Sequence, residues 1–302
     1  MDRASRAARV LVIMTVLVIL NVLPGCGEQA TYLPGAVATQ AIINKGSDTM
    51  VNLALAWAEA YTAQHPQVRI SVTGGGSGTG IAALINGTVD VANASRAMKP
   101  EEVERARANG IEPVEHIVAG DAIAVVVNPT NPVSVLTIDQ LSDIFTGKIT
   151  RWPEVGGEDR PIVLLSRESN SGTHIYFLEH VIRKGEKDNA DDAARLFSPD
   201  TLLMPSSEGI SVEVRQNPNA IGYDGLGYVT PDQKTIGVAR KAGEPYVLPS
   251  IETVTEGSYP IARSLYMYTS GQPTGIIREY LDWITSEEGQ DIVEELGYVP
   301  LR

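Results

Sequence analysis

The chain has 302 residues, of which 43% are hydrophobic and 20% are charged, so it carries enough apolar material for a folded core. Its single cysteine excludes an intramolecular disulfide framework, and its net charge of −13 argues against a nucleic-acid binder, which needs a basic surface. The length exceeds what one hydrophobic core usually supports, so we expect two lobes.

The N-terminal segment has the pattern of a secretion signal. Three arginines precede an apolar run over residues 10–20, which is shorter than the roughly 20 residues that a membrane span needs. The run leads into Leu-Pro-Gly-Cys at 23–26, which resembles the lipobox of bacterial lipoproteins, where the cysteine is lipidated. We therefore expect a lipoprotein signal peptide over 1–25, a lipid anchor on Cys26 and a tether over 26–40. The folded body is then expected on the bacterial membrane, facing the periplasm or the cell exterior. A plain signal-anchor helix is the alternative.

From residue 41 onward, short strand patterns alternate with helical patterns, which is typical of an α/β protein. Strands are predicted at residues 41–44, 68–72, 89–94, 117–128, 162–166, 220–228 and 261–268. Helices are predicted at residues 50–61, 81–86, 100–109, 137–146, 171–184, 274–285 and 287–296.

This order of elements predicts two lobes joined by more than one strand. The candidate crossing strands are residues 119–127 and 261–267, which are mostly apolar. One predicted lobe comprises residues 41–118 plus 265–302, and the other comprises residues 119–264. The cleft between two such lobes is the expected place for a ligand.

Three predicted strand-to-helix turns share one composition. They lie at residues 43–49, 73–80 and 165–173 and are rich in small and hydroxyl residues. Each places free backbone N–H groups at a helix start, where the helix dipole favours an anion. Arg167 adds a planar fork suited to an oxyanion. Any one turn is explained as an ordinary capped connection, but three in one chain predict an anion site. The second lacks the Lys-Ser/Thr ending of a nucleotide P-loop.

A series of motifs in order carries a family resemblance. The motifs are Gly-Ser-Asp-Thr at 46–49, Gly-Ser-Gly-Thr-Gly at 76–80, Val-Asp-Val-Ala-Asn-Ala-Ser-Arg at 89–96, Phe-Thr-Gly-Lys-Ile at 145–149 with Trp152, and Arg167 with Ser-Gly-Thr at 171–173. From about residue 44 onward the chain resembles the phosphate-binding lipoproteins that serve ABC phosphate importers, within the type II periplasmic binding protein superfamily. The resemblance implies a two-lobed fold that closes on one inorganic phosphate, acts as a monomer and delivers the anion to a membrane permease and ATPase complex.

The resemblance also implies a ligand site made by both lobes. Its residues in this chain are Ser47, Asp48, Thr49, Ser77, Ser95, Arg96, Arg167, Ser171, Gly172 and Thr173. The motif around Phe145 and Trp152 is interpreted as packing and turn structure, without a ligand contact. Tyr223 and Asp224 are interpreted more as strand residues than as part of the cleft.

One site position departs from the best-known branch of the family. That branch has an aspartate, which accepts the proton of monohydrogen phosphate, where this chain has Arg96. Because an arginine only donates hydrogen bonds, it cannot distinguish protonated phosphate from sulfate. Asp48 and Glu168 are the candidate acceptors in its place. Arg96 itself is a candidate for a ligand contact or for an ion pair, and the sequence leaves both open.

Other functions fit the sequence less well. Hydroxyls at helix starts suit any tetrahedral anion, so sulfate, molybdate and tungstate remain alternative ligands. An adhesion or signalling module that reuses the fold is a further alternative. Ser171 and His174 are three residues apart, but no nucleophile-elbow motif surrounds them, so we expect no catalysis. The four histidines lack metal-ligand spacing, so we expect neither a metal nor a cofactor.

Overall fold

The computed structural model describes residues 40–185 and 190–302. The predicted signal peptide, Cys26 and all of the tether except Gln40 lie outside the described residues. Gln40 is not tether, because it is the first residue of strand β1 (Gln40–Gly46). Within the described ranges, no helix is both long enough and apolar enough to cross a membrane.

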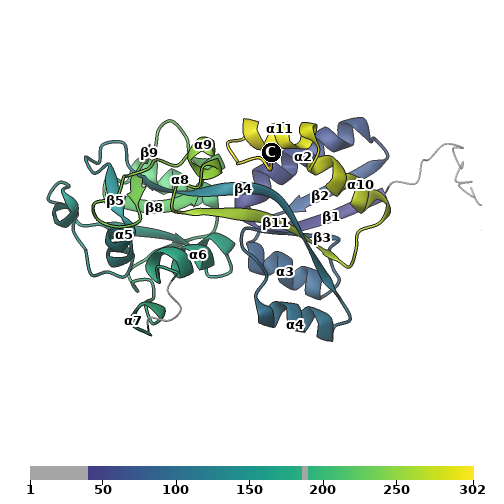
Figure 1. The fold of residues 1–302 in the computed structure, drawn as a ribbon, viewed down its shortest axis with the longest axis horizontal. Helices are drawn as coiled ribbons and strands as arrows, with labels where there is room; N and C mark the ends of the chain where they lie inside the picture. The colour runs from purple at the N-terminus through teal and green to yellow at the C-terminus, as the bar shows by residue number, and fades with distance from the viewer. Residues whose placement is uncertain (1–39, 186–189) are drawn as a thin grey trace, which may run out of the picture. The chain divides into compact units, whose positions relative to one another are not determined.

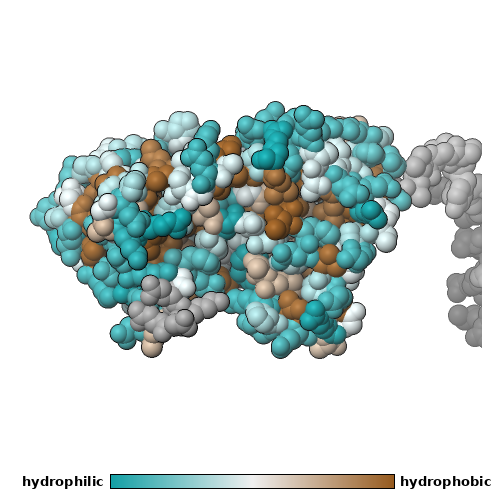
Figure 2. Space-filling view, in the orientation of Figure 1, coloured by the Kyte–Doolittle hydropathy of each residue, from teal (hydrophilic) through white to brown (hydrophobic). Residues whose placement is uncertain are grey.

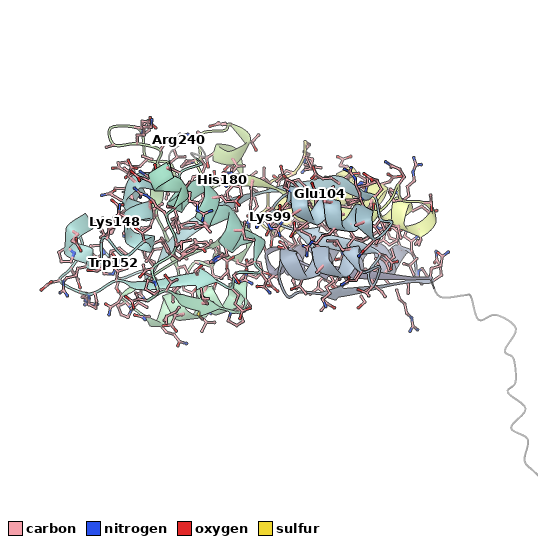
Figure 3. All side chains as sticks on the ribbon, turned by 90° about the horizontal axis from the view of Figure 1, so that it is seen from below. Lys99, Glu104, Lys148, Trp152, His180 and Arg240 are labelled. Carbon is pink, nitrogen blue, oxygen red and sulfur yellow. The ribbon has the colours of Figure 1, made fainter. Side chains whose placement is uncertain are left out.

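The first group of elements builds one side of a mixed sheet. In chain order they are η1 (Asp48–Met50), α2 (Val51–Gln64), β2 (Val68–Thr73), α3 (Ser77–Ile85), β3 (Val91–Ala94) and α4 (Pro100–Ala108), after β1. The sheet order here is β2-β1-β3, with parallel pairing. The C-terminal helices α10 (Gly275–Ile284) and α11 (Glu287–Glu295) return to pack beside α2 (Figure 1). We call these elements lobe 1.

Two long strands run from lobe 1 into the rest of the molecule. They are β4 (Pro113–Val127) and β11 (Ala262–Ser270), and they pair antiparallel along most of their length (Figure 1). The first part of β11 pairs with β4, its later part also pairs with β3, and the far end of β4 pairs with β8 (Ala220–Gly225). The two strands predicted at residues 119–127 and 261–267 are therefore present, as parts of β4 and β11.

The elements between β4 and β11 form the second group, which we call lobe 2. Its sheet continues from β4 through β8, β6 (Val163–Arg167) and β7 (Leu202–Met204), and β9 (Lys234–Thr235) also pairs with β4. A small second sheet pairs β5 (Val135–Thr137) with β10 (Gly237–Ala239). The other elements are α5 (Ile138–Phe145), η2 (Trp152–Val155), α6 (Gly172–Phe177), η3 (Leu178–Ile182), α7 (Ala190–Ala193), α8 (Ser207–Gln216), η4 (Leu226–Tyr228) and α9 (Ile251–Thr255).

The core is divided in the same way as the sheet. In lobe 1, Trp57 is fully buried, and its indole N–H donates to the carbonyl of Gly289 on α11. In lobe 2, the rings of Phe177 and Tyr223 stack with their centroids 3.7 Å apart. Trp152 is also buried, in agreement with the packing role predicted for its motif. Each group of elements therefore has an apolar cluster of its own.

Several predicted elements differ from the structure at their ends or in type. Helix α3 begins at Ser77, four residues before the predicted start, because Gly76 has a φ of 91° and ends the loop there. The helix predicted over residues 171–184 is α6 followed by a π-helical stretch, η3. Helix α8 was not predicted, because its window holds serines and a glycine at most of its early positions.

Candidate functional site

The first and third hydroxyl-rich turns meet between the lobes. Thr49 lies in η1 of lobe 1, and Thr173 lies in the first turn of α6 in lobe 2. Their Oγ1 atoms are 2.8 Å apart although 124 residues separate them in the sequence. Both side chains are almost fully buried. Two hydroxyl groups from different lobes therefore converge on one buried point.

The second turn joins the same region through Ser77, the first residue of α3. Ser77 Oγ accepts a hydrogen bond from the backbone N–H of Ser95 at 3.0 Å and lies 3.2 Å from Ser95 Oγ. Gly172, the first residue of α6, faces this pair from lobe 2. A Cβ on Gly172 would lie 2.4 Å from Ser77 Oγ and 2.6 Å from Ser95 Oγ, so glycine permits the close approach of the lobes.

Two further serines hold the turns in shape. Ser171 is the N-cap of α6, and its Oγ accepts from the backbone N–H groups of Thr173 and His174 at 3.2 and 3.4 Å. Ser47 precedes η1 as its N-cap, is 2% exposed and makes no cap hydrogen bond through its side chain. Both predicted residues therefore stand at a helix start that borders the site.

Arg167, the last residue of β6, is the principal cation of the predicted set. Its side chain is 1% exposed, and Nη2 forms a 2.6 Å ion pair with Asp48 Oδ2 across the lobes. Nη1 donates to Ser207 Oγ at 2.9 Å, so the unpredicted helix α8 supports the guanidinium. Asp48 Oδ1 accepts from the N–H of Gly75 in the second turn. The third and first turns are thus linked by charge as well as by hydroxyl contact.

A second buried cation, Arg263, was not predicted. It lies on β11, and its Nη2 forms a 2.8 Å ion pair with Asp121 Oδ2 on β4. The same nitrogen donates to Thr173 Oγ1 at 3.0 Å, and Nη1 is buried without a partner. Burial raises the pKa of Asp121, and Arg263 opposes that rise. The sequence signal for this pair is that each predicted apolar crossing strand contains a single charged residue. Burying a charge is costly unless it is paired, so the two charges could have been expected to pair with each other.

Asp224 on β8 lies next to this group of residues, which is the less favoured of the two positions expected for it from the sequence. It is 2% exposed, and one carboxyl oxygen, Oδ1, accepts from the N–H of Gly225 at 2.8 Å. The other, Oδ2, is buried without a hydrogen-bond partner. Burial raises the pKa of Asp224 to about 6, although the charge of Arg167 and the Gly225 N–H act to lower it.

The guanidinium of Arg96 is paired with a carboxylate of its own lobe. Nη1 and Nη2 donate to the two carboxyl oxygens of Glu102 at 2.8 and 2.7 Å, and Nη1 also donates to the carbonyl of Ala97. Of the two roles left open by the sequence, the ion pair is the one that the structure shows. Glu168, one of the two candidate proton acceptors, is exposed, whereas Asp48 contacts Arg167.

The enzyme alternative gains no support from the geometry of His174. Its Nδ1 lies 3.0 Å from Ser166 Oγ, and its ring stacks on Phe197. Burial lowers the pKa of His174, and Ser171 serves as a helix cap, so these two residues do not form a nucleophile and base pair. Among the described residues, no cluster of three or more His, Cys, Asp or Glu side chains is arranged to hold a metal ion.

Sequence comparisons place the chain among known binding proteins. The PBP superfamily domain model matches residues 34–288. The phosphate-binding protein PstS of Pseudomonas aeruginosa is 34% identical over 85% of this chain and 81% of its own length. The PstS of Bacillus subtilis is also 34% identical, over 87% of this chain and 82% of its own length. The chain belongs to the PstS family of the PBP superfamily. The relatives in this family carry the name of a binding protein and not of an enzyme.

Solved structures show the same fold. A putative phosphate ABC transporter substrate-binding protein from Clostridium perfringens, solved with bound phosphate, is 32% identical, with a TM-score of 0.75. The match covers 87% of this chain and all of that one. An ABC-type phosphate transport receptor from Vibrio cholerae is 28% identical, with a TM-score of 0.66 over 85% of this chain and 99% of that one. The PstS-family chain therefore has the two-lobed α/β fold of type II periplasmic binding proteins, as expected from its sequence.

Proposed function

We propose that the protein is a receptor that captures inorganic phosphate between its lobes and delivers it to an ABC importer. The observation that carries the proposal is the convergence of Thr49, Thr173, Ser77 and Ser95 beside two buried arginines. Short hydroxyl donors, helix N-termini and a guanidinium fork match the oxygens of a tetrahedral dianion. The phosphate-bound relative with the same fold supports this choice of ligand.

Capture follows from the fact that the donors belong to both lobes. An anion that binds Thr49 in lobe 1 and Thr173 in lobe 2 stabilises the arrangement in which the lobes touch over the one in which they are apart. Arg167 contributes charge from lobe 2, while its ion pair with Asp48 holds the lobes in register. The closed form then differs in surface from the open form, and that difference is what a transporter recognises.

Selectivity for phosphate over sulfate requires a hydrogen-bond acceptor at the anion. We assign this role to Asp48, because Glu168 is exposed and Arg96 is engaged by Glu102. A carboxylate accepts a hydrogen bond from protonated phosphate and repels a sulfate, which has no proton to donate. Asp48 already accepts from Gly75 and Arg167, and its remaining lone pairs are available to a ligand proton.

The decisive experiment is a calorimetric titration of the purified, ligand-free protein with phosphate at neutral pH, repeated in excess sulfate. We expect one-to-one binding that sulfate does not displace. The matched variant Asp48→Asn keeps the size of the side chain and replaces a carboxylate oxygen with an amide donor, so it should lose discrimination against sulfate. Absence of binding heat with phosphate, or equal displacement by sulfate in the parent protein, would move the assignment to another oxyanion.

We further propose that residues 41–118 plus 265–302 form one lobe and that residues 119–264 form the other. The separate apolar clusters around Trp57 and around Phe177 support this division. A cysteine placed on each lobe, spin-labelled and measured by electron resonance, should show one distance change on adding phosphate. An unchanged distance would argue against lobe movement about the crossing strands.

The N-terminal sequence bears on where the receptor is located. We propose that residues 1–25 are removed and that Cys26 carries a lipid, which holds a monomeric receptor on the outer side of the bacterial membrane. The apolar run and the Leu-Pro-Gly-Cys sequence support this. Cys26→Ser should release the protein into the soluble extracytoplasmic fraction without changing phosphate affinity. Retention in the membrane would indicate an uncleaved signal anchor instead.

A further inference from the structure

Asp224 is a buried carboxyl group that has no part in the proposed phosphate capture. It lies on β8 beside Arg167, and its Oδ2 atom is buried with no hydrogen-bond partner. An unpaired carboxylate oxygen in a buried position is costly, whereas a protonated carboxyl group bears that burial more easily. The position therefore favours a carboxyl group that changes its protonation state.

The groups around Asp224 come from every element packed against it. Arg167 on β6 is the nearby cation, and Asp121 on β4 is a second carboxylate that raises the pKa of Asp224. The phenol groups of Tyr223, Tyr228 and Tyr298 are close enough for Asp224 to raise the pKa of each. At neutral pH these phenols are uncharged. The charge on Asp224 is therefore balanced by Arg167 and opposed by Asp121.

A bound dianion changes this balance. The wall of the site already holds Asp48, Asp121 and Asp224 against two arginines, Arg167 and Arg263. Two further negative charges compete with Asp224 for the positive charge of Arg167, because one guanidinium cannot fully neutralise both. Burial already raises the pKa of Asp224 to about 6, so a moderate additional rise carries it past neutral pH.

We propose that Asp224 takes up a proton when the phosphate dianion binds. The proton comes from solvent and forms an O–H bond on the carboxyl group, so the bound state contains the dianion and a neutral Asp224 while Arg167 turns its charge to the ligand. In this way the negatively charged protein holds a dianion in a site with three nearby carboxylates. The proposal rests on phosphate being the ligand, and it gives Asp224 a positioning role through Arg167.

The test is calorimetry of phosphate binding at pH 8 in two buffers whose ionisation enthalpies differ. Because the buffer supplies any proton taken up, the difference in measured enthalpy gives the number of protons bound. The parent should take up a measurable fraction of a proton at pH 8 and a larger fraction at pH 7, and the affinity for the dianion should rise by up to about tenfold as the pH is lowered from 8 to 7. An enthalpy equal in both buffers would overturn the proposal.

Two isosteric variants locate the proton. Asp224→Asn should still bind phosphate and take up almost no proton, whereas Asp121→Asn should retain the uptake. The reverse pattern would assign the proton to Asp121 and refute the role of Asp224. An infrared difference spectrum of the parent on phosphate addition should show a new protonated-carboxyl band, so the proposal remains falsifiable if a variant fails to fold. Absence of binding heat in all buffers would refute phosphate binding itself and is distinct from binding without proton uptake.

Discussion

Gly172 offers a direct test of whether the lobes must approach each other as closely as the structure shows. A methyl group in Gly172→Ala would lie 2.4 Å from Ser77 Oγ and 2.6 Å from Ser95 Oγ, and both serines belong to the opposite lobe. Forcing extra atoms into a packed contact costs about 1–3 kcal/mol. Opening the lobes relieves this clash, so the cost falls on the closed form. We therefore expect phosphate affinity to fall by roughly 5- to 150-fold, since about 1.4 kcal/mol is a factor of ten.

The control is Gly209→Ala in the first turn of α8. The nearest atoms to a Cβ at Gly209 are 3.4 Å away or more, which is ordinary contact. Both substitutions replace a glycine near a helix start, so they share the same gain in helix propensity. Calorimetry should show weak binding only for Gly172→Ala, while thermal unfolding without ligand should show that neither variant is destabilised. Unchanged phosphate affinity in Gly172→Ala would refute the closure shown at this contact.

Three further predictions concern the buried charges. Arg167→Ala should weaken phosphate binding by about 1.5–3 kcal/mol in calorimetry, against about 0.5–1.5 kcal/mol for Thr49→Ala, because charge-assisted hydrogen bonds are the stronger class; equal losses would contradict this ranking. Arg263→Met should lower the free energy of unfolding by about 3–5 kcal/mol in denaturant titrations, because it leaves Asp121 buried without a cation, and adding Asp121→Asn should recover most of the loss. Because the pKa of Asp224 is about 6 in the folded protein against 3.8 as its ordinary value, the folded state holds more protons in this window and stability falls as pH rises through it. Asp224→Asn should therefore be more stable than the parent above pH 6, by at most about 3 kcal/mol, with the difference vanishing near pH 3; a constant difference across pH would refute the titration of Asp224.

Local patterns predicted most of the fold, because the pattern that identifies each of these elements lies within its own segment of the sequence. The crossing strands β4 and β11 are long apolar runs, and the pattern of each strand is complete within the run itself. Helix α8 was missed because its early residues are small and polar, and its position depends on packing Ile210 and Val214 against β8. The π-helical stretch in η3 has the same side-chain periodicity, within the error of the pattern, as a continuous helix.

The residues of the candidate site also fall into two groups, those that the local sequence identifies and those that depend on a distant partner. Its hydroxyls and glycines lie in turns whose composition is visible over a few residues, and the family resemblance named them individually. Their roles as phosphate contacts stay a prediction. The ion pair of Asp121 with Arg263 joins residues 142 positions apart, and nothing local to either residue identifies its partner. Asp224 was missed for the same reason, because the charge that acts on it belongs to Arg167 on the neighbouring strand β6, far away in the sequence.

Arg96 shows how one substitution at a family position shifts the charge balance of the whole site. An aspartate there would add a carboxylate at the anion, whereas this chain has an arginine that is neutralised by Glu102 and held 7% exposed. Burial of an arginine is tolerable only with such a bidentate partner, so the pair is a structural unit that adds almost no net charge to the cleft. The carboxylates that act on the ligand must then come from elsewhere in the site. In our proposals, Asp48 accepts a hydrogen bond from the protonated ligand, the role that the resemblance gives to the aspartate of the other branch, while Asp224 takes up a proton from solvent as a separate step.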